Sequence, residues 1–185
     1  PATHLDGDAQ LLMVYHRLPF DEIPGPTGIE RRPPRSPNGI IPSLLRFFSD
    51  GRSGAWVAWS MQPSRDVSGF ESRVPVDAKA YPRLTASRIA LTGEDVALFY
   101  KQFSKEAFWP ILFSFPSRAV FDQAHWEHYV EINHLFAERV AREAERGALV
   151  WVHEYNLWMV PGHLRKLHGR TGSDRSFAPG VGLGF

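Results

Sequence analysis

Ala148-Leu149-Val150-Trp151-Val152-His153 is the stretch of this 185-residue sequence that decides the fold. The run is apolar, rich in residues that favour strands and too short for a core helix, so it predicts a strand buried on both faces. Similar runs predict strands at residues 11–15, 54–59 and 87–91. Strands of this kind occur in parallel sheets that helices cover, which predicts an α/β fold.

Helical patterns separate the predicted strands. Apolar residues at i, i+3, i+4 and i+7 predict an amphipathic helix over residues 40–48. Thr92 is the predicted N-cap of a second helix, and a longer one is predicted from 122 to 146, ended by Gly147. A last helix is predicted over 157–167. This alternation predicts a Rossmann-like parallel sheet with helices on both faces.

The proline-rich segment at residues 20–37 is predicted to be a loop, because its prolines exclude a helix. Ligands of parallel sheets gather outside the carboxyl ends of the strands. Here those ends are Arg17, Trp59 and the turn at residues 153–156.

Length and composition bound the class of protein. One core, or half of a larger enzyme, fits 185 residues. We expect a flexible N-terminus at 1–9, a Rossmann-like domain at 10–168 and an irregular Gly-rich tail at 169–185. Lys and Arg total 21 against 20 Asp and Glu, so no nucleic-acid partner is expected. No apolar run is long enough to cross a membrane, which makes the cytoplasm the expected location.

Metal and thiol chemistry are not expected either. The sequence has no Cys, which excludes disulfides, thiolate metal sites and Cys nucleophiles. His125, His128 and His134 share the long predicted helix, but no carboxylate completes a ligand set with them, so they are interpreted as solvated helix residues.

Arg17 and the Asn38-Gly39 pair predict a phosphate site. Arg17 follows a buried strand, and Asn38 and Gly39 precede a helix whose free N–H groups favour an anion. The alternative is that Arg17 forms a salt bridge with Asp21 or Glu22.

Two further groups of residues could hold a hydroxyl-rich ligand. Tyr100 and Trp109 belong to a stretch that mixes aromatic and charged residues, which suits a polyol pocket but also a core helix with one solvated side. Glu154 and Asn156 follow the clearest strand, where Glu154 could accept a hydrogen bond from a hydroxyl group. The alternative there is an ordinary helix N-cap.

Six segments in this order resemble the retaining glycosyltransferases of the trehalose-phosphate synthase family. They are Val14-Tyr15-His16-Arg17-Leu18-Pro19-Phe20-Asp21-Glu22, Ser36-Pro37-Asn38-Gly39-Ile40, Trp56-Val57-Ala58-Trp59, Ser104-Lys105-Glu106-Ala107-Phe108-Trp109-Pro110-Ile111-Leu112, Asn133-His134-Leu135-Phe136-Ala137-Glu138 and Trp151-Val152-His153-Glu154-Tyr155-Asn156-Leu157-Trp158.

The resemblance implies a fold and roles for individual residues. Family members join an acceptor-binding Rossmann half to a donor-binding half, in the architecture called GT-B. By this similarity Arg17 and Gly39 face phosphate groups, and Tyr100 and Trp109 line the acceptor pocket. Glu154 stands where the family has an Asp that holds the acceptor hydroxyl. Asn156 stands where trehalose-phosphate synthases carry His.

Asn156 and the Tyr15-His16-Arg17 opening are similar to the glucosylglycerol-phosphate branch of that family. This implies ADP-glucose as donor, glycerol 3-phosphate as acceptor and no cofactor. The alternatives are transfer to glucose 6-phosphate, or a non-catalytic module that binds phosphate or a partner. The family's donor half has no counterpart in these residues, so the chain alone is expected to be inactive and to self-associate through its exposed cleft surface.

Overall fold

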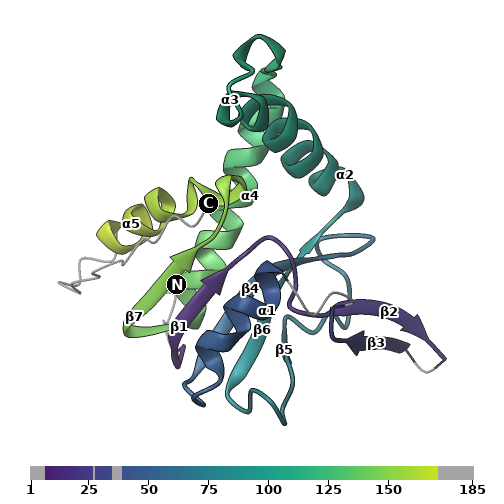
Figure 1. Cartoon of the computed structure of the whole chain (residues 1–185), viewed down its shortest axis with the longest axis vertical. Helices are drawn as coiled ribbons and strands as arrows, with labels where there is room; N and C mark the ends of the chain where they lie inside the picture. Colours follow the sequence, from purple (N-terminus) through teal and green to yellow (C-terminus); the bar gives the residue numbers. More distant parts are fainter. Residues whose placement is uncertain (1–6, 27, 35–38, 171–185) are drawn as a thin grey trace.

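The computed structural model describes residues 7–26, 28–34 and 39–170 (Figure 1). Five strands form one sheet in the order β5-β6-β4-β1-β7. Their bounds are β1 Ala9–Val14, β4 Gly54–Met61, β5 Arg73–Pro75, β6 Leu84–Leu91 and β7 Ala144–Val152. β1 pairs in parallel with β4 and β7, and β4 pairs in parallel with β6. The predicted parallel sheet is therefore confirmed, and the short strand β5 adds one antiparallel edge.

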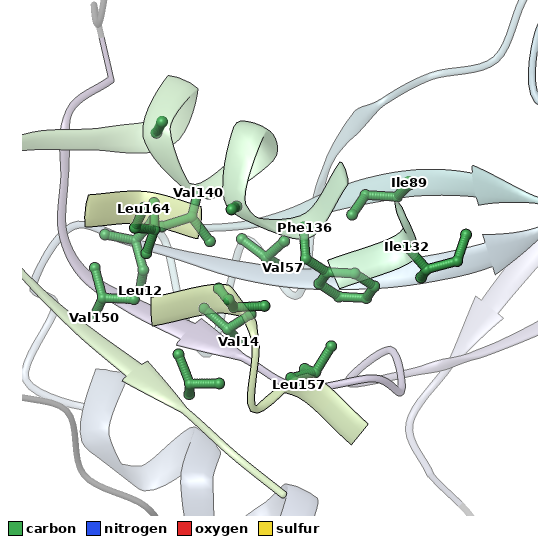
Figure 2. Packing of buried hydrophobic residues seen from close by; sticks show 14 of the residues in the cluster. Leu12, Val14, Val57, Ile89, Ile132, Phe136, Val140, Val150, Leu157 and Leu164 are labelled. Atoms are coloured by element: carbon green, nitrogen blue, oxygen red, sulfur yellow. The ribbon is translucent and has the colours of Figure 1, made fainter. Parts of the chain in front are cut away.

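Helices cover both faces of the sheet, which explains the unbroken apolar runs of the strands. Successive side chains of a strand point to opposite faces. Leu12 and Val14 of β1 accordingly join the core under α4 (Gln123–Glu143), whereas Leu11 and Met13 join the core under α1 (Ile40–Leu45). Figure 2 shows the first of these cores, in which side chains of α4 meet those of β1, β4 and β7.

The segment predicted as a loop at 20–37 contains a β-hairpin, which corrects that prediction. β2 (Asp21–Gly25) pairs antiparallel with β3 (Gly28–Arg32) in a separate two-stranded sheet. Proline cannot donate to a strand ladder, but an edge strand tolerates it. Both strands of a two-stranded hairpin are edges, so Pro24 fits opposite Ile29.

The predicted end of the long helix is also corrected. α4 ends at Glu143, and Gly147 lies inside β7 with φ +83°. The β1–β7 register shifts between Ala9 and Leu11, as expected where extra residues bulge from one strand. Glycine supplies the positive φ that such a bulge needs.

A continuous helical segment follows β6 at the carboxyl edge of the sheet. Thr92 is confirmed as its N-cap, because its hydroxyl and the side chain of Asp95 form a capping box. The segment consists of α2 (Gly93–Val96), η2 (Ala97–Phe108), which is wound as a π-helix, and α3 (Trp109–Leu112).

Short elements complete the described chain. They are η1 (Arg46–Phe48), η3 (Pro116–Arg118), η4 (Tyr155–Leu157) and α5 (Val160–Arg170). β1 begins at Ala9 and α5 ends at Arg170, and residues 171–185 of the predicted tail lie outside the described residues. None of the helices in the described ranges combines the length and apolarity of a membrane span.

Candidate functional site

Two turns lie side by side at the carboxyl edge of the sheet. The backbone N–H of Tyr15 donates to the carbonyl of Val57 at 3.1 Å, and the N–H of His153 donates to the carbonyl of Val14 at 2.9 Å. These bonds continue the strand pairing by one residue. They bring the segments that follow β1 and β7 into contact, as the sequence predicts for a parallel sheet.

Glu154 is the centre of this contact. Its Oε1 accepts a hydrogen bond from the Tyr15 hydroxyl at 3.4 Å. Its Oε2 lies 3.2 Å from Asn156 Nδ2 and 3.4 Å from His16 Nδ1. The same Asn156 amide nitrogen lies 3.3 Å from His16 Nδ1. The structure thus joins Glu154 and Asn156, both predicted site residues, to two residues of the β1 turn.

The backbone of Glu154 is strained. Its φ of +70° and ψ of 157° fall in a region that only glycine adopts freely. Strain of this kind persists where the surrounding structure holds the residue in place, and it concentrates at functional sites.

A buried amide in α4 supplies that hold. Asn133 donates to the carbonyls of Tyr129 at 2.9 Å and Asn156 at 3.0 Å, and its Oδ1 accepts from the N–H of Met159 at 3.2 Å. The Tyr129 hydroxyl donates to the carbonyl of Tyr155 at 2.7 Å. Asn133 is fully buried, so these bonds replace water that cannot reach it.

Burial sets the protonation of the cluster. It raises the pKa of Glu154, against the hydrogen bond from Tyr15 and the positive charges of Arg17 and Lys105. Burial and the charge of Glu154 raise the pKa of the Tyr15 phenol. Burial, followed by the charges of Arg17 and Lys105, lowers the pKa of His16 to about 3. His16 is therefore a neutral imidazole at physiological pH.

A cavity of about 900 Å³ opens beside His16. Its walls come from the β1 turn, the β2–β3 hairpin, the end of β4 and the η2 segment. The lining residues include His16, Arg17, Leu18, Phe20, Glu22, Trp59, Ser60, Arg88 and Tyr100. The ring of Tyr100 stacks on His16 with centroids 4.9 Å apart and an interplanar angle of 27°.

Arg17 is exposed at this cavity and makes no ion pair with a carboxylate of the described residues. The predicted alternative partner Glu22 is engaged elsewhere: it pairs with Arg88 and Arg31 and accepts a bond from the Ser60 hydroxyl at 2.6 Å. The backbone of Arg17 is fixed instead, because its carbonyl accepts from the Trp56 indole at 2.8 Å.

Trp109 and Gly39, two of the predicted site residues, do not line the cavity. Trp109 is 47% exposed on α3 and packs on the ring of Phe113. Gly39 caps α1 with φ +137°, is exposed and does not line the cavity. Asn38 lies outside the described residues.

His16 and Asn133 are site residues to which the sequence analysis assigned no role. His16 could have been found, because it is a polar residue directly after a buried strand and beside Arg17. Asn133 gives no local signal, because its role depends on a contact between α4 and a turn 23 residues away. Within the described ranges no cluster of three or more His and carboxylate residues could hold a metal ion.

Comparison with known proteins identifies the family. A model of glycosyltransferase family 20 matches residues 10–175. The chain belongs to glycosyltransferase family 20. A glucosylglycerol-phosphate synthase of Pseudomonas anguilliseptica is 56% identical over 162 residues, which are 87% of this chain and 22% of that protein. A glucosylglycerol-phosphate synthase of Synechocystis is 41% identical over 86% of this chain and 32% of that protein.

Other family 20 relatives are more distant. A trehalose-6-phosphate synthase of Mycobacterium ulcerans is 34% identical over 90% of this chain and 32% of that protein. Among solved structures, a trehalose 6-phosphate synthase from Burkholderia multivorans superposes with a TM-score of 0.70 at 20% identity, over 95% of this chain and 33% of its own. The E. coli structure bound to UDP-2-fluoro glucose superposes with a TM-score of 0.66 at 20% identity. These structures confirm the predicted fold. The chain spans between about a fifth and a third of the length of these relatives.

Proposed function

We propose that this chain is the acceptor-binding part of a retaining glycosyltransferase that transfers glucose from ADP-glucose to glycerol 3-phosphate. The observation that carries the proposal is the contact of Glu154 with His16, a residue that lines the same cavity as Arg17 and Tyr100. A free guanidinium suits a phosphate group. A partly exposed carboxylate suits a hydroxyl group, so a ligand that carries a phosphate and a hydroxyl group matches the chemistry of Arg17 and Glu154.

The reaction assigns a role to each of these residues. Arg17 pairs with the phosphate of the acceptor, and Glu154 accepts a hydrogen bond from the hydroxyl group that will react. The hydroxyl oxygen forms a bond to the anomeric carbon of glucose while the bond from that carbon to ADP breaks. In the family resemblance the departing phosphate takes the hydroxyl proton, so Glu154 orients the acceptor rather than acting as a nucleophile.

The choice of glycerol 3-phosphate rests on the closer match to the glucosylglycerol-phosphate synthases, at 56% and 41% identity against 34% for a trehalose-6-phosphate synthase. It also rests on the contact between His16 and Asn156, two positions that are similar to that branch. Transfer to glucose 6-phosphate and non-catalytic phosphate binding are the alternatives that the experiment must separate. A cytoplasmic location and self-association through exposed cleft surface stay predictions.

Calorimetric titration of the 185-residue chain with glycerol 3-phosphate and glucose 6-phosphate tests the proposal. We expect glycerol 3-phosphate to bind more tightly, and Arg17→Ala to weaken it at least about tenfold, the loss of a charge-assisted hydrogen bond. Arg165→Ala, an exposed arginine on α5, is the control that should change nothing. Tighter binding of glucose 6-phosphate would favour the alternative acceptor. Equal affinities of the parent chain and Arg17→Ala for glycerol 3-phosphate would show that Arg17 does not bind the phosphate group.

A further inference from the structure

The winding of η2 changes which of its residues share a face. In an α-helix, residues five apart point about 140° away from each other around the axis. The i→i+5 bonding of a π-helix widens the turn and brings such residues close to one face. The bonds follow this pattern, because the N–H of Trp109 donates to the carbonyl of Ser104, and the Ser104 hydroxyl donates to the carbonyl of Phe99 at 2.8 Å.

The wider turn places Lys105 over Tyr100. The Lys105 ammonium lies 4.9 Å from the centroid of the Tyr100 ring, a cation–π distance. That ring also stacks on His16 and lines the cavity beside Arg17. Lys105 therefore touches the wall of the cavity without being one of the residues that line it.

Lys105 and Arg17 form a pair of available cations at this wall. Lys105 is exposed, and neither residue makes an ion pair with a carboxylate in the described part of the chain. Arg88 and Arg31, the other cations near the cavity, are already paired with carboxylates: both contact Glu22, and Arg31 also pairs with Glu71.

The charges of Lys105 and Arg17 also act on the same groups. Both lower the pKa of His16, in addition to the larger effect of burial, and both oppose the rise that burial causes in the pKa of Glu154.

We propose that Lys105 is a second phosphate-binding residue, which shares the acceptor phosphate with Arg17. A phosphate dianion gains from two cations, and the two residues differ in kind: Arg17 offers a planar fork of donors, and Lys105 offers a mobile point charge. The π-helix has a part in this site, because an α-helical η2 would turn Lys105 away from Tyr100. This inference rests on the proposed function.

The test compares three variants in calorimetric titrations with glycerol 3-phosphate and with inorganic phosphate. Lys105→Met keeps an unbranched apolar stem over Tyr100 and removes the charge, whereas Lys105→Arg keeps a charge. Lys101→Met is the matched control, since Lys101 is exposed on the same segment. We expect Lys105→Met to weaken both ligands about three- to tenfold, and Lys105→Arg to bind within about twofold of the parent chain. The difference in affinity between the parent chain and Lys105→Met should become smaller at high salt, because salt screens the charge of Lys105.

The outcomes separate this inference from the function on which it rests. If the parent chain binds glycerol 3-phosphate and Arg17→Ala weakens it, while Lys105→Met behaves as Lys101→Met does, Lys105 has no part in phosphate binding and only this inference falls. If Lys105→Met and Lys105→Arg weaken binding equally at every salt concentration, Lys105 acts through packing. That result would also overturn the proposal that Lys105 binds phosphate. If the parent chain binds neither ligand, the proposed function falls too.

Discussion

Glu154 combines a proposed binding role with a backbone conformation that suits glycine. At φ +70° and ψ 157° a side chain costs about 1–3 kcal/mol. The bonds that Asn133 and Tyr129 make to the turn at residues 155–156 offset this cost. Strain that is kept at such a residue is consistent with selection for the carboxylate rather than for stability.

Glu154→Gly should therefore be more stable than Glu154→Ala by about 1 kcal/mol or more. Both variants lose the same hydrogen bonds from Tyr15 and Asn156, and only Gly relieves the backbone. Urea unfolding of the two proteins measures the difference. Equal midpoints and slopes for the two variants would show that the turn is not strained.

His16 should make stability depend on pH. Burial lowers its pKa from 6.5 to about 3, so between these values the folded state binds fewer protons than the unfolded state. The contribution of neutral His16 is complete above about pH 6.5 and is lost as the pH falls toward 3.

Between about pH 7.5 and about pH 5 the free energy of unfolding of the parent chain should fall by about 1–2 kcal/mol more than that of His16→Gln. Chemical unfolding at several pH values gives both curves, and the comparison cancels other groups that titrate in this range. Parallel curves for the two proteins would contradict a buried neutral His16.

At the scale of elements, the sequence predicts those helices and strands that form through interactions within one short segment. The buried strands and the Thr92 cap follow from apolar runs and from a side chain that bonds its own turn. The β2–β3 hairpin could not be predicted, because its prolines obscure a strand pattern that pairing completes. Gly147 fits a helix end and a strand bulge equally well in sequence, and the contacts between β1 and β7 decide between them. The π-winding of η2 has no local signal either.

The site residues divide in the same way, into those predicted from their own segment and those whose role depends on contacts with distant segments. Arg17, Glu154 and Asn156 were predicted because they follow buried strands, and the sheet brings such positions together. Trp109 was predicted from the mix of aromatic and charged residues around it and from the family resemblance, and the structure places it on α3, outside the lining of the cavity. Lys105 was not predicted, because its contact with Tyr100 depends on the winding between them.

The close packing of α1 and η1 on the sheet predicts that Gly54 cannot be enlarged. A Cβ at Gly54 would overlap the Phe48 ring, which is 1% exposed, and would lie 3.0 Å from the carbonyl oxygen of Leu11. Gly54→Ala should cost about 1–3 kcal/mol of unfolding free energy. Gly162→Ala in α5, where no atom lies within 4 Å of the new Cβ, should be neutral or stabilising. Equal stabilities of the two variants in thermal unfolding would contradict this packing.

At the scale of the whole molecule, the chain matches 22% to 32% of the length of its synthase relatives. Glycosyl transfer needs cations or N–H groups aimed at the departing diphosphate, because stabilisation of developing charge is usually the largest catalytic effect. The family resemblance assigns those groups to the donor half. We therefore expect the 185-residue chain alone to release no ADP from ADP-glucose.

The central claim is tested most directly by joining residues 1–170 of this chain to the remaining C-terminal part of the Pseudomonas anguilliseptica relative and following ADP release with ADP-glucose and glycerol 3-phosphate. The account predicts sustained ADP release, formation of glucosylglycerol phosphate, and a loss of at least about a hundredfold in Glu154→Ala and Arg17→Ala. Arg165→Ala should keep full activity. A folded fusion that forms no product, or one that Glu154→Ala leaves fully active, would contradict the claim that this chain binds and orients the acceptor.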